Sequence, residues 1–144
     1  MLFRSRLFYQ VAVRPLVLGQ QPDSALVEKN LAEDVPQVLD YLEGMAPADG
    51  FLFGALSIAD VSIACFFRTA GFARFKIDAA RWPRTAGLVA RVLATDGFQH
   101  AKPYEDKMMR TPPAEHRAAL AEMGAPLTRD TLGTTTARPG VMSL

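Results

Sequence analysis

The chain has 144 residues, of which 49% are hydrophobic and 22% charged, and its formal net charge is +1. This length fits one domain with a core of its own, and the composition is that of a globular chain, not a disordered one. So small a net charge provides no overall field that attracts nucleic acid or an anionic membrane, and we predict neither as a partner. The charge is nevertheless uneven, because residues 1–22 carry three arginines and no acid, whereas residues 23–50 carry seven acids and one lysine.

The first predicted element is a helix over residues 2–17. Several of its apolar residues recur at helical spacing, namely Phe3, Leu7, Phe8 and Val11. The segment also contains arginine and no acid, as a targeting peptide does, but Gln10 and Arg14 interrupt its apolar run. We therefore expect the first helix of a bundle in a cytoplasmic protein. No segment approaches the roughly 20 apolar residues of a membrane span.

The second predicted helix starts at Asp23 or Ser24, either of which can cap it. Its apolar residues follow the helical period: Leu26, Val27, Leu31, Val35, Val38, Leu39 and Leu42. Pro36 lies inside this pattern and predicts a kink or a split, since proline lacks the N–H that a helix interior uses. The segment GMAPADG over residues 44–50 ends the helix.

Four further helices complete the predicted fold. The third starts at Ser57, the fourth starts with Pro83 in its first turn, and the fifth covers 98–109 after a turn at 95–97. A last helix is capped by Thr111 and ends at Gly124. Strand-like alternation is missing from the sequence, so we predict an all-α bundle of five or six helices. It forms one domain over residues 1–124, followed by an irregular, threonine-rich tail over 125–144.

The start of the third helix has the pattern of a capping box, in which Ser57 and Asp60 each accept a hydrogen bond from the other's backbone N–H. Leu56 and Val61 occupy the positions of the hydrophobic staple that accompanies such a box. As a catalytic pair, Ser57 and Asp60 lack a neighbouring histidine or lysine base. We therefore interpret them as structural and predict no catalytic residue in the chain.

Cys65 is the only cysteine, so the chain cannot form an internal disulfide, which suits a reducing cytoplasm. The residue sits in an apolar run, and His100 and His116 lie far from it in the sequence. We expect a buried, inert thiol and no metal site.

Two stretches together resemble the C-terminal helical domain of glutathione S-transferases. The first is FLFGALSIADVSIACFF at 51–67 and the second is DAARWPRTAGLVARVLATDGF at 78–98. In that family a G-x-x-[ST]-x-A-D stretch opens the buried central helix, and a helix beginning with proline follows. The matching residues are Gly54, Ser57, Ala59, Asp60, Trp82 and Pro83. The resemblance covers about residues 1–109.

The resemblance implies a transferase-type helical domain without the part that holds glutathione. In the family that site belongs mainly to a thioredoxin-like N-terminal domain, which supplies the residue that interacts with the glutathione thiol. A free thiol has a pKa of about 8.5 and needs such help near neutral pH. We therefore expect no cofactor and no transferase activity from this chain alone, with glutathione bound only beside a thioredoxin-like domain. By this resemblance we interpret the chain as one part of a truncated or split transferase.

The family's helical domain also lines the hydrophobic co-substrate pocket with its first helix. By this resemblance Tyr9, with Phe8 and Ser5, is the candidate pocket lining; the alternative is that these side chains pack on the second or third helix. The first helix also carries more apolar residues than one core-facing stripe needs. We therefore expect it to be exposed and to pair in a homodimer, or to bind a separately encoded thioredoxin-like domain. A stand-alone protein-interaction module with the same fold remains the other interpretation.

Overall fold

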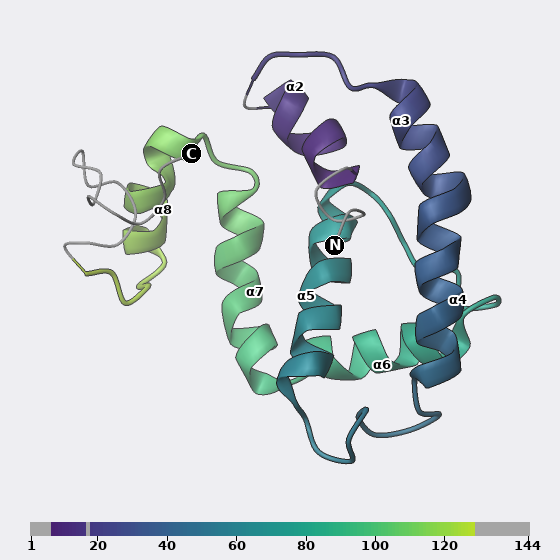
Figure 1. The fold of residues 1–144 in the computed structure, drawn as a ribbon. Helices are drawn as coiled ribbons and strands as arrows, with labels where there is room; N and C mark the ends of the chain where they lie inside the picture. Colours follow the sequence, from purple (N-terminus) through teal and green to yellow (C-terminus); the bar gives the residue numbers. More distant parts are fainter. Residues whose placement is uncertain (1–6, 17, 129–144) are drawn as a thin grey trace, which may run out of the picture. The chain divides into compact units, whose positions relative to one another are not determined.

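A computed structural model describes residues 7–16 and 18–128, and within them the ordered elements are all helical (Figure 1). No strand occurs in this part of the chain, which confirms the all-α prediction. None of the helices in these residues is long and apolar enough to cross a membrane.

Contacts within the chain gather into two units, residues 1–95 and residues 96–144, which are described separately below. The boundary lies inside the range 1–124 that the sequence predicts to be one domain. Most of the predicted tail, residues 129–144, lies outside the described residues.

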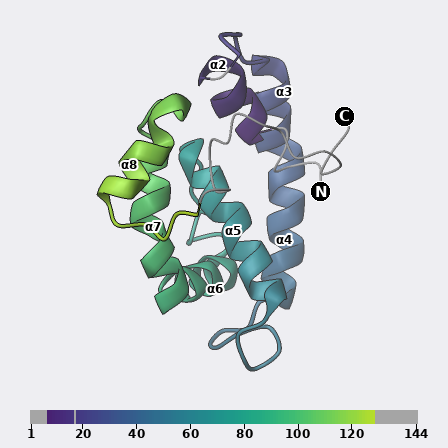
Figure 2. The ribbon, with the colours of Figure 1, turned by 90° about the vertical axis from the view of Figure 1, so that its left-hand side faces the viewer.

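The first two helices of the first unit each contain a π-helical turn. Tyr9–Val13 leads into α2 (Arg14–Leu16), and Asn30–Asp34 joins α3 (Ser24–Lys29) to α4 (Val35–Met45). Each π turn starts six residues before a proline, Pro15 or Pro36. A wider turn at this point accommodates the missing N–H and the bulk of the proline ring. Pro36 therefore does not split the helix, because α3 and α4 run on as one helix through the π turn (Figure 2).

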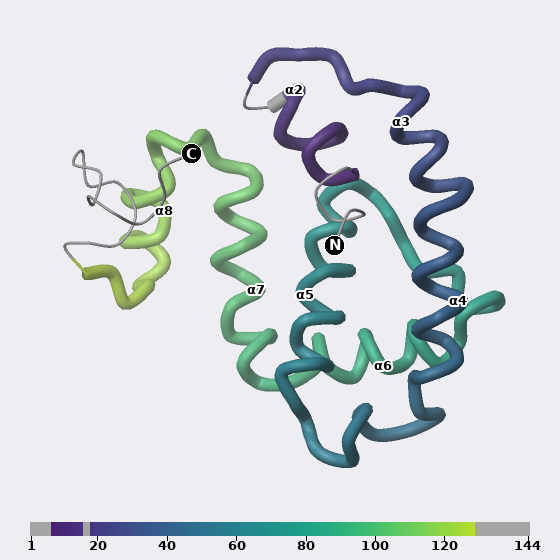
Figure 3. Tube along the Cα trace, in the orientation of Figure 1, coloured from purple at the N-terminus to yellow at the C-terminus, as the bar shows by residue number. Residues whose placement is uncertain are grey.

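Two further helices complete the first unit, α5 (Ile58–Phe72) and α6 (Pro83–Leu93). In Figure 3 the α3–α4 helix and α5 lie alongside each other, α6 crosses near their ends, and the segment 46–57 loops out beyond them. Residues from all four helices form the core: Leu7, Val35, Leu39, Phe67, Trp82 and Val89. This core fixes the ends of α4, α5 and α6 relative to one another.

The helix α5 has an exposed edge. Ala64, Phe67 and Ala70 are buried, but Ile58, Ser62 and Cys65 are exposed. The expectation of a buried thiol was therefore wrong. Because the apolar run includes both faces of α5, hydrophobicity alone did not distinguish the core-facing positions from this edge.

The second unit contains α7 (Asp96–Met108), a 3-10 turn (Pro113–Glu115) and α8 (His116–Glu122). Gly124 follows α8 with φ +71°, as expected of a helix-ending glycine. Thr111 does not cap the last helix, contrary to prediction. Its hydroxyl donates to the carbonyl of Lys107 at 2.8 Å and so belongs to the end of α7.

Candidate interaction surface

The carboxylate of Asp60 holds the start of α5 and the preceding loop together. Ser57 and Asp60 form the predicted capping box. Asp60 Oδ2 accepts from the Ser57 N–H at 2.9 Å and from the Ser57 hydroxyl at 2.5 Å, while Oδ1 accepts from the Leu52 N–H at 2.9 Å. Asp60 is fully buried, so these donors replace the water that the carboxylate has lost.

The protonation of Asp60 reflects the same contacts. Burial acts to raise the pKa of this carboxyl, but the hydrogen bonds from Leu52 and Ser57 outweigh burial and lower the pKa below its usual value. The carboxylate is therefore charged at neutral pH, the form in which it accepts all three hydrogen bonds.

Arg91 of α6 holds the other side of the loop 46–57. Its guanidinium donates to three backbone carbonyls, those of Gly50 at 2.9 Å, Pro47 at 3.3 Å and Ala48 at 3.4 Å. The fixed fork of a guanidinium suits such multiple contacts. Between Arg91 and Asp60 the loop is held at both of its ends.

This fixed loop and the first residue of α5 present apolar side chains to solvent. Phe53 is 75% exposed and Ile58 is 80% exposed, with Leu56 also exposed; we call these three residues the loop tip. The predicted staple between Leu56 and Val61 remains a prediction. An ordered loop that carries exposed apolar side chains loses little conformational entropy when a partner covers it.

The outward side of the α3–α4 helix is a second exposed apolar area. Val38, Tyr41 and Met45 share one face of α4 by their spacing, and Leu31 lies on the preceding π turn; we call these four residues the outer face. Tyr41 is 68% exposed and Met45 is 52% exposed. Figure 1 shows this helix at one edge of the first unit, with α5 alongside it.

The inward side of α4 fixes α6. Glu43 Oε1 accepts from the Arg84 N–H, and Oε2 accepts from the N–H and the hydroxyl of Thr85, at 2.8–2.9 Å. Burial acts to raise the pKa of Glu43, but these hydrogen bonds and the charge of Arg84 lower it overall. One turn earlier, Asp40 accepts from the Trp82 indole N–H at 2.6 Å.

Sequence reasoning missed these two acids. The first turn of α6 carries no acid and its N-cap, Trp82, has no side-chain acceptor, so the helix needs a cap from elsewhere. The signal was an acid pair one turn apart, Asp40 and Glu43, beside a helix start without a cap of its own.

The residues predicted to line a pocket lie on the first helix. Tyr9 is 43% exposed and Phe8 is half-buried, while Ser5 lies outside the described residues, so their grouping remains a prediction. The apolar surface expected on this helix is not seen at Leu7, which is buried in the core, or at Val11, which packs against the core. Within the described residues, most of the large apolar side chains that are exposed lie on the outer face and the loop tip.

Within the described residues no group of three or more His, Cys, Asp or Glu side chains could hold a metal ion. Comparisons with family models, curated proteins and solved structures found no match to the chain.

Proposed function

We propose that the chain is a helical domain of the glutathione S-transferase type that works by docking, and that its partner is a second copy of itself. The observation that carries this proposal is the outer face, an apolar surface on a helix whose opposite side is fixed in the core.

Support for the family comes from the capping box at Ser57 and Asp60 at the head of α5, the feature on which the sequence resemblance rests. The helix that begins with Pro83 follows α5, as the resemblance implies. Asp60 also fixes Leu52, so the same box sets the course of the loop before α5.

Support for docking comes from the exposure of large apolar side chains on ordered backbone. Contiguous exposed apolar patches of more than a few hundred Å² on soluble proteins commonly mark interaction sites. The outer face has four such side chains within fifteen residues of one helix. Covering them removes apolar surface from water at about 25 cal/mol per Å², before the costs of association.

A second copy in antiparallel orientation suits the outer face. Leu31 precedes Val38 by seven residues and Met45 follows it by seven, so a two-fold axis beside Val38 pairs Leu31 with the Met45 of the other copy. Of the exposed acids of this helix, Glu28 and Glu33 lie in its N-terminal half, and Asp40, in its C-terminal half, forms a salt bridge with Arg81. The antiparallel arrangement keeps these acids away from their counterparts, whereas a parallel pair stacks like charges.

The test is size-exclusion chromatography with light scattering on the full chain. We expect the parent chain to be a dimer that dissociates on dilution, since an interface centred on one helix is small. Tyr41→Glu combined with Met45→Glu places charges in the contact and is expected to give a monomer. Phe53→Ser, a change on the loop tip, serves as the matched control and is expected to leave the dimer intact.

Two results contradict docking through the outer face altogether. One is a monomeric parent that also fails to bind a hydrophobic fluorescent dye, because such a chain has no functional apolar surface. The other is a dimer that persists when Tyr41 and Met45 are replaced by glutamate. A monomer that binds dye contradicts the self-partner and favours the second candidate below.

The second candidate is one part of a split transferase, whose partner is a thioredoxin-like domain; the Ser57–Asp60 resemblance favours it. Here too the isolated chain is expected not to be retained on immobilised glutathione and not to conjugate glutathione to an electrophilic aromatic. Adding a thioredoxin-like domain of a glutathione transferase is then expected to restore retention. Retention of the chain by itself contradicts both candidates.

A further inference from the structure

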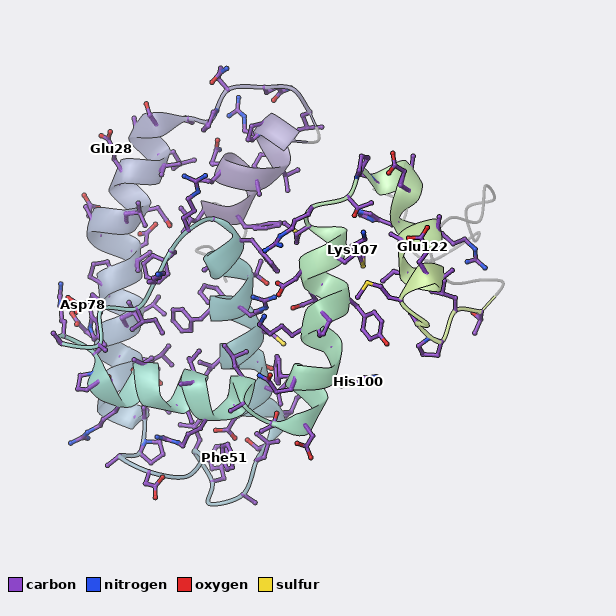
Figure 4. All side chains as sticks on the ribbon, turned by 180° about the vertical axis from the view of Figure 1, so that it is seen from behind. Glu28, Phe51, Asp78, His100, Lys107 and Glu122 are labelled. Carbon is purple, nitrogen blue, oxygen red and sulfur yellow. The ribbon has the colours of Figure 1, made fainter. Side chains whose placement is uncertain are left out.

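The second unit contains a depression of about 360 Å³ between the end of α7 and α8. Lys107 and Arg110 line it from α7 and the turn after it, and Glu115 and Glu122 line it from the 3-10 turn and α8. Figure 4 shows Lys107 on α7 and Glu122 on α8 near each other at this place. The depression therefore has one cationic wall and one anionic wall.

These four charged side chains do not neutralise one another. Within the described residues, Lys107 and Arg110 form no salt bridge or side-chain hydrogen bond, and neither do Glu115 and Glu122. An ion pair on α7, between Lys102 and Asp106, lies outside the depression. Two cations and two carboxylates are thus available to a ligand.

The chain that separates the two walls is held in place. His116 Nε2 lies 2.9 Å from the Met108 carbonyl and 2.8 Å from the Thr111 carbonyl. A ring nitrogen shared between two carbonyls acts as the donor, so the proton is on Nε2. This bond joins the start of α8 to the end of α7 and fixes the distance between the two walls.

We propose that this depression binds a neutral, zwitterionic α-amino acid. Its carboxylate pairs with Lys107 and Arg110, and its ammonium pairs with Glu115 and Glu122. Each charge of the ligand then lies beside two side chains of opposite charge. A singly charged ion pairs with only one of the two walls.

The size and the remaining lining narrow the class of ligand. One water occupies about 30 Å³ of liquid, so the depression holds roughly a dozen waters, or a ligand of about ten non-hydrogen atoms. The small side chains of Ala118 and Ala119 contribute apolar surface to the lining. This suits an amino acid with a short aliphatic side chain.

The affinity is expected to be modest, since exposed ion pairs are weak and the ligand is small. We test binding of L-valine to the full chain by following backbone amide shifts in two-dimensional NMR. Saturable shifts confined to residues 107–122 are expected, with a Kd of about 1 mM or weaker. Two analogues with a single charge, 3-methylbutanoate and 2-methylpropylamine, are each expected to bind about two- to five-fold more weakly.

Variants of the charged residues test which wall of the depression binds which charge of the ligand. When Lys107→Met and Arg110→Met are combined, L-valine is expected to bind no better than 2-methylpropylamine, whose own binding is unchanged. When Glu115→Gln and Glu122→Gln are combined, L-valine is expected to bind no better than 3-methylbutanoate, whose own binding is unchanged. Lys76→Met, an exposed lysine of the first unit, is the matched control and is expected to leave binding intact.

Three results overturn the proposal. The first is no saturable shift up to about 50 mM L-valine, well above the expected Kd. The second is a set of shifts spread over both units, and the third is unchanged binding of L-valine after either wall has lost its charges.

Discussion

Leu52 donates its backbone N–H to the carboxylate of Asp60, eight residues ahead, at 2.9 Å. One buried carboxylate therefore caps α5 and also fixes the loop that leads into it. The Asp60 carboxylate of the capping box therefore also fixes the direction in which the chain approaches α5.

Ser57→Ala is expected to lower the free energy of unfolding by about 0.5–2 kcal/mol, the usual cost of losing an N-cap side chain. The backbone N–H of Ser57 still reaches Asp60, so part of the cap survives. Urea unfolding of parent and variant measures the change. An unchanged midpoint at equal slope contradicts the structural role of Ser57.

Asp60→Asn is expected to destabilise the chain more than Ser57→Ala does, by about 1–3 kcal/mol. The amide of the asparagine offers one acceptor oxygen where the carboxylate of Asp60 has two, and its NH₂ group faces backbone donors. Urea unfolding at pH 7 measures the change, with Asp49→Asn on the exposed part of the loop as the control. A variant as stable as the parent contradicts the account of the cap.

The lowered pKa values of Asp60 and Glu43 predict acid sensitivity. In the unfolded chain these carboxyls titrate near pH 4, and in the folded chain they titrate lower. Their contribution to stability is therefore complete above about pH 5 and is lost as the pH falls through the folded pKa values. Unfolding free energy measured from pH 7 down to about pH 3 should fall less steeply in Asp60→Asn than in the parent. Equal slopes contradict this assignment.

Glu43→Gln is expected to loosen the start of α6, because an amide has one acceptor oxygen for the N–H groups of Arg84 and Thr85. Hydrogen exchange of the Arg84 and Thr85 amides measures this directly, and faster exchange is expected at both. Glu28→Gln, on the exposed side of α3, is the control. Unchanged exchange in Glu43→Gln means that the cap from α4 does not hold α6.

Arg91→Lys keeps the charge but loses the guanidinium fork that holds Pro47, Ala48 and Gly50. We expect faster hydrogen exchange and faster proteolysis within residues 46–57, with little change in α6 itself. If the loop of the Arg91→Lys variant is protected as well as the loop of the parent, the proposed role of the fork is wrong.

The sequence predicted the local features of this fold well. The helical class and the capping box at Ser57 follow from spacing within a few residues. The π turns were not predicted. They start six residues before Pro15 and Pro36, whereas the sequence rules predict only that a proline kinks or breaks a helix.

Contacts between distant parts of the chain could not be predicted from the sequence. Glu43 and Thr85 are 42 residues apart, and their hydrogen bonds follow only once α4 and α6 are packed. The exposure of Cys65 and the burial of Leu7 likewise depend on which face of an apolar helix the neighbours cover. The positions of the exposed apolar side chains, on which the proposed interaction surface rests, therefore had to come from the structure.

The central claim is that two copies pair along the outer face with Val38 at the two-fold axis. Cross-linking tests it most directly, using Val38→Cys in a chain where Cys65→Ser removes the native thiol. Residues at the axis of two packed helices come within reach of a disulfide, so mild oxidation is expected to link Val38→Cys rapidly into a covalent dimer. Ser62→Cys, on the exposed edge of α5, is expected to stay monomeric under the same oxidation. Failure of Val38→Cys to cross-link, or equal cross-linking of both variants, would contradict the account.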